Sequence, residues 1–258
     1  MRATSNPAFR NLPRNGYATF DQQRTAAGPQ QPYGGGYPGQ VADRPMTIDD
    51  VIIKTGITLA VAVLTGVLTV LFHAWALALP ALVVGLVISL VIIFKRTPSA
   101  PLVLVYAAAE GVLLGAITGL FDSIYPGIAF QAILGTFGVF AAMLIVYKTG
   151  AVRVTPRLTK WIIGATVGAV VVMLADLLVH LFGGDLGIRD GGPLAIVFSL
   201  IVIGIAAFNL LLDFEQATQM IRGGYPAKWA WYAAFGLMVT LVWLYLEILR
   251  LLSYLQRN

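Results

Sequence analysis

Four carboxylates inside long apolar stretches are the residues of this sequence best suited to chemistry: Glu110, Asp176, Asp213 and Glu247. A charged carboxylate costs roughly 3 kcal/mol or more in the middle of a lipid bilayer. A membrane segment therefore retains one only where it is paired, faces a cavity, or carries protons or cations. Asp213 is the most informative of the four, because it follows directly on a long apolar run. Together the acids indicate an ion path or a sensing site.

The composition identifies the class of protein in which these acids lie. The chain has 258 residues, of which 58% are hydrophobic and 11% charged, and its mean hydropathy is +0.82. Such a balance predicts a polytopic membrane protein. The absence of cysteine excludes disulfides, thiol nucleophiles and cysteine-ligated metals, and two histidines are too few for a His-rich metal site. The net charge of +5 fits membrane topology better than a nucleic-acid partner.

The chain divides into a polar N-terminal part and a series of apolar segments. Residues 1–46 are rich in Gly, Pro, Gln and Tyr and are predicted to be a disordered tail, followed by a membrane domain over residues 47–258. Thr47 and Asp50 have the spacing of a helix capping box. Each apolar segment has about the 20 residues that a helix needs to cross the hydrocarbon core. The seven predicted spans are Val51–Phe72, Leu77–Phe94, Pro101–Phe121, Gly127–Tyr147, Trp161–Phe182, Pro193–Leu212 and Trp229–Leu252.

The distribution of charge along these segments predicts the orientation of the chain. Most lysines and arginines fall in the tail and in alternate loops, for example Lys95 and Arg153, whereas the other loops carry Asp122 and Asp190. Positive charge marks the cytoplasmic side. We therefore expect a plasma-membrane protein with a cytoplasmic N-terminus and an external C-terminus.

Glycines at every fourth residue predict where helices pack closely. Gly111, Gly115 and Gly119 lie in the third span, and Gly164 and Gly168 in the fifth. Small residues at this spacing allow two helix backbones to approach in lipid. We expect both sets to pack inside the bundle; the alternative is a homodimer face.

A rise of about 1.5 Å per residue assigns a depth to each acid. Asp213 is predicted at the cytoplasmic end of the sixth span, with Asn209 one turn before it on the same face. Two interpretations of Asp213 follow: it is a gate, or its side chain extends to the cytoplasmic interface near Arg222 or Lys228. Glu110 lies near the middle of the third span, without a basic residue at its depth. It is either neutral through desolvation or faces water or a cation.

The other two acids are predicted in the outer third of the membrane, each near a basic residue. Asp176 precedes His180 by one turn, and Glu247 precedes Arg250 by three residues. Each pair is either a local structural contact or the outer part of an acidic ladder that continues through Glu110 to Asp213. Oxygen ligands suit protons and hard cations such as calcium, and Asp213 and Glu110 are the candidate calcium ligands.

Three segments resemble the Bax inhibitor/YccA family, the transmembrane Bax-inhibitor-motif proteins. Leu211–Ile221 resembles the end of the family's sixth helix, Leu244–Ser253 its seventh and Ala109–Gly115 its third. The resemblance covers the membrane region from about Thr47 to Leu255 and excludes the tail. The tail and the linker before Trp229 favour a bacterial, actinobacterial branch, and hence the bacterial inner membrane.

The resemblance implies an all-α fold in which six helices surround a central seventh, and a pH-sensitive calcium leak. It also implies a pair of aspartates on helices six and seven as the pH sensor. Asp213 matches the first member of that pair. The second aligns with Thr240 when the final Leu-Arg-Leu-Leu is matched, and with Glu247 when Leu-Tyr-Leu-acid is matched.

Two functions of different classes remain from the sequence. The leading one is a pH-sensitive leak channel or transporter for cations, calcium above all, with possible proton coupling and no cofactor. The alternative is a non-conducting regulator, such as a modulator of a membrane-bound protease. An enzyme is not expected, because no nucleophile–base pair or phosphate-binding loop is present in the sequence.

Overall fold

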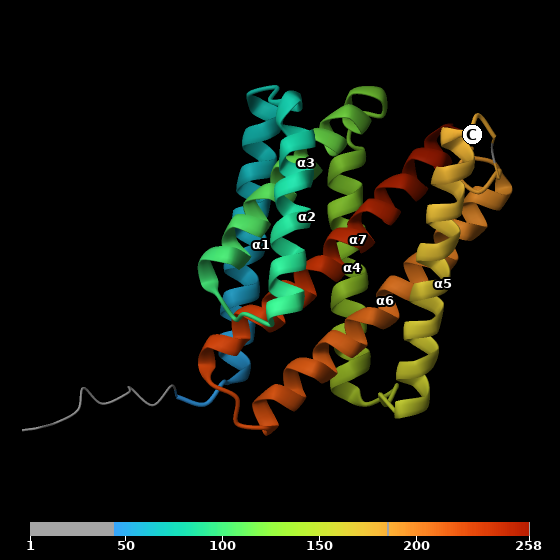
Figure 1. Ribbon diagram of the computed structural model, residues 1–258. Helices are drawn as coiled ribbons and strands as arrows, with labels where there is room; N and C mark the ends of the chain where they lie inside the picture. Colours follow the sequence, from blue (N-terminus) through green and yellow to red (C-terminus); the bar gives the residue numbers. More distant parts are fainter. Residues whose placement is uncertain (1–43, 185, 258) are drawn as a thin grey trace, which may run out of the picture. The chain divides into compact units, whose positions relative to one another are not determined.

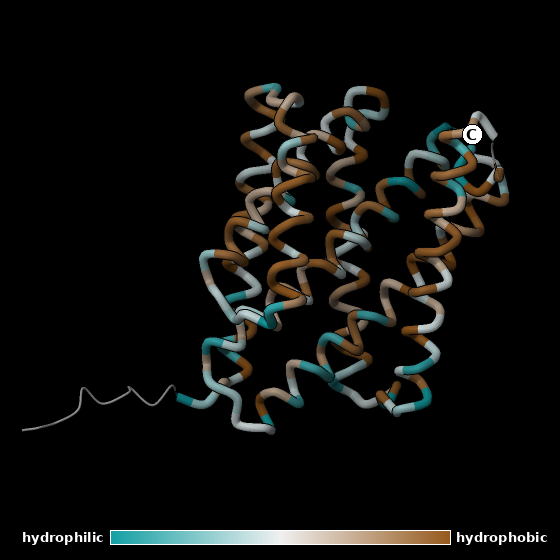
Figure 2. Tube along the Cα trace, in the orientation of Figure 1, coloured by the Kyte–Doolittle hydropathy of each residue, from teal (hydrophilic) through white to brown (hydrophobic). Residues whose placement is uncertain are grey.

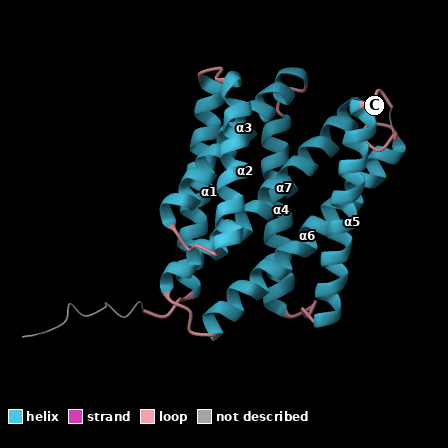
Figure 3. Cartoon of the chain, in the orientation of Figure 1, coloured by secondary structure: helices cyan, strands magenta, loops and turns pink. Residues whose placement is uncertain are grey.

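The computed structural model describes residues 44–184 and 186–257, and this part of the chain consists of helices joined by short loops (Figures 1 and 3). It contains seven helices long and apolar enough to cross a membrane, as the sequence predicts. They are α1 (Ile48–Leu71), α2 (Ala78–Lys95), α3 (Ala100–Ile124), α4 (Ile128–Thr149), α5 (Pro156–Leu181), α6 (Pro193–Arg222) and α7 (Ala230–Arg257). Short 3₁₀ turns, η2 (Trp75–Leu77) and η3 (Ala227–Trp229), precede α2 and α7. The predicted disordered tail lies outside the described residues except for its last three.

Local sequence signals explain where several helices begin and end. The predicted capping box is present at α1, where the Thr47 amide donates to Asp50 Oδ2 at 3.0 Å and the Asp50 amide donates to Thr47 Oγ1 at 3.3 Å. Helices α3, α5 and α6 each have a proline in the first turn, where its missing N–H is not needed. Helix α4 ends at Gly150, whose φ of +69° suits glycine.

The segment just before α1 pairs with the linker between α6 and α7. The Met46 amide donates to Tyr225 O at 2.7 Å, and the Ala227 amide donates to Arg44 O at 2.8 Å. Met46 is buried. Residues 44–46, assigned to the tail from composition, are therefore ordered by backbone hydrogen bonds that composition does not reveal. This end of the bundle is called the N-terminal end below.

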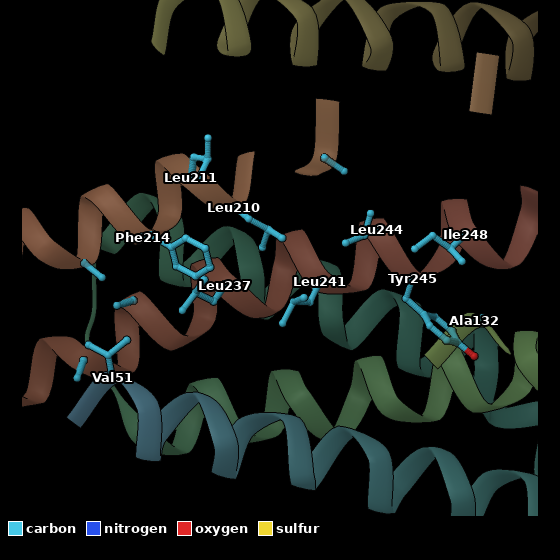
Figure 4. Packing of buried hydrophobic residues seen from close by; sticks show 14 of the residues in the cluster. Val51, Ala132, Leu210, Leu211, Phe214, Leu237, Leu241, Leu244, Tyr245 and Ile248 are labelled. Carbon is cyan, nitrogen blue, oxygen red and sulfur yellow. The ribbon is translucent and has the colours of Figure 1, made fainter. Parts of the chain in front are cut away.

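Helix α7 occupies the centre of the helical bundle. It is the most buried of the seven helices and packs against α1, α3, α4 and α6, as expected for the central helix of the family fold. Leu210 and Phe214 of α6 meet Leu237, Leu241 and Leu244 of α7 in the main hydrophobic cluster (Figure 4). Helix α2 packs mainly on α3 and helix α5 mainly on α6, so these two helices lie outside that core.

The helices consist mostly of hydrophobic residues, and many of the hydrophilic residues lie near the loops and helix ends (Figure 2). Large side chains such as Ile52, Phe94 and Leu178 are exposed on the bundle surface. An apolar surface of this extent is unstable in water and is solvated by lipid chains. The bundle is therefore built for the interior of a membrane.

The glycine prediction is confirmed for α3 and wrong for α5. A Cβ atom at Gly111 or Gly115 would collide with the backbone of Ala62 or Gly66 in α1, so these glycines allow α1 and α3 to touch. A Cβ at Gly164 or Gly168 would meet nothing within 4 Å. Helix α5 packs on α6 through a different face, which leaves its two glycines on the bundle surface.

Candidate functional site

Asp213 and Thr240 form a polar pair between α6 and α7. Thr240 Oγ1 donates a hydrogen bond to Asp213 Oδ2 at 2.5 Å. Thr240 is 7% exposed, whereas Asp213 is only partly buried. Gly236, one turn before Thr240, faces the other oxygen, because a Cβ built there would lie 3.7 Å from Asp213 Oδ1. Of the two positions that the family resemblance aligned with the second sensor residue, Thr240 is the one beside Asp213.

Asp213 has no cationic partner among the residues that the structure describes. The ion pairs there are Arg44–Asp50, Arg189–Asp176 and Arg250–Glu247. Within the described residues, the ion pairs do not join Asp213 to Arg222 or Lys228. Thr240 is the hydrogen-bond partner of this carboxyl, and a hydroxyl can both donate to and accept from it.

Asp213 lies deeper within its helix than the sequence indicated. The apolar run ends near Leu212, but α6 continues to Arg222, which puts Asp213 nine residues, or about 13 Å, before the end of the helix. The added turns contain helix-forming residues, and Phe214, Ala217 and Met220 bury an apolar stripe. This stripe has helical periodicity, which a search for continuous apolar segments misses.

Asn209 has neighbours different from those of Asp213. Its Nδ2 donates to Thr166 Oγ1 of α5 at 2.8 Å and to Ile205 O at 2.9 Å. The amide therefore faces α5, whereas the Asp213 carboxyl faces α7. The two side chains are one turn apart on α6 but take part in different helix contacts.

Glu110 is partly buried where α3 packs on α2. A Cβ at Gly85 of α2 would lie 3.3 Å from Glu110 Oε1, and Tyr106, one turn earlier on α3, is its polar neighbour. As with Asp213, none of the ion pairs within the described part of the chain includes Glu110.

Helix α7 lies between the surroundings of Glu110 and those of Asp213. The ring of Tyr106 packs edge-on against Phe235 of α7 at a centroid distance of 4.9 Å, and the next residue, Gly236, lies beside Asp213. Tyr106 therefore lies between Glu110 and α7, whereas the Asp213 carboxyl faces α7 directly. A single site shared by both acids is not formed in this conformation.

Asp176 and Glu247 belong to a cluster of charges at the end of the bundle opposite to the N-terminal end. Arg250 Nη1 donates to Glu247 Oε1 at 2.7 Å, as the i,i+3 spacing predicts. Arg189 Nε lies 3.5 Å from Asp176 Oδ2, so Asp176 has Arg189 as its ion-pair partner and not the predicted His180. Burial lowers the pKa of the Arg189 guanidinium, which Asp176 and Glu247 oppose by attraction.

This outer cluster is anchored by the loop between α5 and α6. Tyr254 Oη donates to Arg189 O at 3.2 Å, and Arg257 Nη1 donates to Asp190 O at 3.1 Å. Sequence spacing could not reveal the role of Arg189, because the loop that carries it is far in sequence from α7. Glu247 lies two turns, about 10 Å, beyond Thr240 on α7, so the outer cluster is separate from the Asp213–Thr240 pair.

The four acids thus occupy three places: the α6–α7 pair, the α2–α3 contact and the outer cluster. No group of three His, Cys, Asp or Glu side chains converges anywhere in residues 44–184 and 186–257. Asp213 and Glu110, the candidate calcium ligands, each present a single carboxyl. Calcium takes six to eight oxygen ligands in its stable sites, so either acid alone supplies only part of such a ligand set.

The fold and its apolar surface define a polytopic membrane protein, with seven helices of membrane-spanning length in the described part of the chain. A family profile described as "Bax inhibitor 1 like" matches residues 6–257. The chain belongs to this family, as the resemblance of its third, sixth and seventh helices indicates. A comparison with curated proteins gives no match.

Proposed function

We propose that this protein is a pH-sensitive pathway for cations, calcium above all, and that Asp213 and Thr240 form its gate. The observation that carries the proposal is a partly exposed carboxyl between α6 and α7 with a hydroxyl partner and no cationic partner in the described chain. A structural carboxylate in a membrane-spanning helix is normally paired with a base, and an unpaired one is a candidate site for an ion or a proton.

The hydrogen bond between the two residues supports a response to protons. When the Asp213 carboxyl is charged, the Thr240 hydroxyl donates to it; when it is protonated, the same hydroxyl can accept. The pair therefore persists in both states, while the charge at the α6–α7 contact changes by one unit. Protonation removes the cost of keeping a charge away from water, which for a carboxylate inside a membrane is about 3 kcal/mol or more. Proton binding is thereby coupled to helix packing.

Glu110, at the α2–α3 contact, is proposed as a second carboxyl that attracts cations. Because Glu110 lies at the α2–α3 contact and Asp213 at the α6–α7 contact, conduction past both acids requires a rearrangement of these helices. The outer pairs of Asp176 and Glu247 are proposed to stabilise the opposite end of the bundle. No catalytic residue and no cofactor enters the mechanism.

We also propose that the protein lies in the bacterial inner membrane with its N-terminal end in the cytoplasm. The basic residues of the described loops support this orientation. Arg96 and Arg153 lie in the two loops at the N-terminal end, and Lys95 and Arg157 lie in the helix turns next to these loops, where the positive-inside rule puts the cytoplasm.

Reconstitution tests whether the chain conducts at all. Purified full-length protein is incorporated into liposomes that contain a calcium indicator, and calcium entry is measured over a pH series against protein-free liposomes. We expect entry that depends on pH and is reduced by Glu110→Gln. Correctly folded protein that admits no calcium at any pH would overturn the proposal and favour the non-conducting regulator, for which binding to a membrane protease is then the assay.

A further inference from the structure

An apolar cavity of about 310 Å³ opens on the side of the bundle between α1 and α4, with α3 and α7 behind it. Its rim contains lipid-facing side chains such as Val67, Leu71 and Phe137, all largely exposed. None of the four acids is among its lining residues. The cavity is therefore a lateral crevice open to lipid and separate from the candidate gate.

The hydroxyl groups in this crevice are already hydrogen-bonded to protein. Thr118 Oγ1 and Tyr245 Oη lie 2.8 Å apart and share a hydrogen bond, and Thr136 Oγ1 donates to Ala132 O at 2.7 Å. A buried water needs two to four polar partners, and an apolar cavity without them accepts hydrocarbon ligands. An alkyl chain fits these walls better than water or an ion.

The dimensions of the crevice match one leaflet of a bilayer. Along α1 it extends from Leu59 to Leu71, about 18 Å at the rise of an α-helix. Half of the hydrocarbon core is about 15 Å thick. The volume is about twice that of a 150 Å³ cavity that accepts benzene, which leaves room for on the order of a dozen carbon atoms.

A second cavity, of about 740 Å³, continues the crevice toward the end of the bundle opposite to the N-terminal end. The two cavities share Val70, Thr118 and Ala129 as lining residues. The second contains the indole of Trp75, which packs on Gly119, and the imidazole of His73. Tryptophan is typical of the headgroup level of a membrane.

The charge of the second cavity selects the headgroup. Its described lining includes one carboxylate, Asp122, and no lysine or arginine. Asp122 Oδ1 accepts from the Gly127 amide at 2.9 Å and the Ala129 amide at 3.4 Å, while Oδ2 has no hydrogen bond from the described residues. A carboxylate beside an indole is a suitable environment for an ammonium group, which the ring attracts as well.

We infer that the two cavities together bind one lipid of the adjoining leaflet, with an acyl chain in the crevice and an ammonium headgroup at Asp122 and Trp75. The apolar walls bind the chain, and the single negative charge discriminates against anionic headgroups. The site is independent of the proposed cation pathway.

Native mass spectrometry of the detergent-purified full chain tests this site with two probes of identical acyl chains, phosphatidylethanolamine and phosphatidylglycerol. The wild-type protein should retain phosphatidylethanolamine in preference. Val67→Trp fills the crevice and should weaken binding of both lipids roughly tenfold. Leu64→Trp, on the exposed face of α1 outside the crevice, is the matched control and should bind as the wild type does. Leu71→Trp, nearer the mouth, replaces Val67→Trp if that variant does not fold.

Asp122→Asn keeps an oxygen for the Gly127 amide but removes the charge. The preference for phosphatidylethanolamine should fall to about equal binding of the two lipids. Unchanged binding by the folded crevice-filling variant would overturn the acyl-chain site. An unchanged headgroup preference in Asp122→Asn would overturn the role of Asp122. An equal loss of lipid binding in Val67→Trp and Leu64→Trp would show that the substitutions act through a general change of the surface and not through the crevice, which would overturn the site.

Discussion

The contact between α1 and α3 predicts that Gly115→Ala destabilises the bundle. The added Cβ would lie 2.8 Å from Gly66 Cα, whereas ordinary van der Waals contact begins at 3.4 Å. The shortfall is therefore about 0.6 Å at least. Gly66 is itself a backbone neighbour without a side chain that could rotate away, so the two helices must separate.

The magnitude follows from two opposing effects. Overpacking of a close contact lowers the free energy of unfolding by about 1–3 kcal/mol. Replacing glycine by alanine inside a helix raises it by about 0.8–1.0 kcal/mol. The net loss is on the order of 1–2 kcal/mol. For a domain of this size that corresponds to a decrease in Tm of about 2–8 °C.

Gly168→Ala is the matched control, because its Cβ would meet nothing within 4 Å. It should leave Tm unchanged or raise it slightly. Both variants are measured by thermal unfolding in the same detergent, with loss of tryptophan fluorescence or of monodisperse protein as the signal. Equal Tm values for the two variants, or a lower one for Gly168→Ala, would refute the packing of α3 on α1.

Two further predictions concern the polar pairs. Thr240→Val removes the hydrogen bond to Asp213, so it should cost about 1–3 kcal/mol of stability and change the pH profile of calcium entry. Thr240→Ser keeps the hydroxyl, so its stability and its pH profile should stay close to those of the wild type. Identical behaviour of the two variants would count against the pair. Arg250→Gln leaves the buried Glu247 carboxylate, 3% exposed, without its partner and should cost about 3–5 kcal/mol. The double variant with Glu247→Gln should recover much of that loss in Tm, and no recovery would show that the ion pair is unimportant.

The sequence predicts the helices well because the bilayer imposes a simple rule. About 20 apolar residues cross it, and this rule locates every span, including the one that ends near Leu212. It does not locate the true end of α6 at Arg222, because the last turns are amphipathic and obey a 3.6-residue period instead. For the same reason the sequence puts Asp213 at the end of the helix, whereas α6 continues for nine residues beyond it.

The site is less predictable because its contacts join distant segments. The spacing of Glu247 and Arg250 on one helix reveals their pair, whereas Arg189 reaches Asp176 from a loop whose course is set by Tyr254 and by the end of α7. The packing of Gly115 and the openness of Gly168 follow from which face of each helix meets a neighbour. The repeat of small residues contains no such information.

The most direct test of the gate is calcium entry into liposomes over a pH series for wild type, Asp213→Asn and Glu215→Gln. Glu215 is a carboxylate two residues from Asp213 that accepts from Tyr147 Oη at 3.0 Å and from Gln219 Nε2 at 3.0 Å, so its substitution is matched in chemistry and helix position. Entry through wild type and Glu215→Gln should vary with pH, and entry through Asp213→Asn should not. A wild-type pH profile in Asp213→Asn would contradict the assignment of Asp213 as the gate.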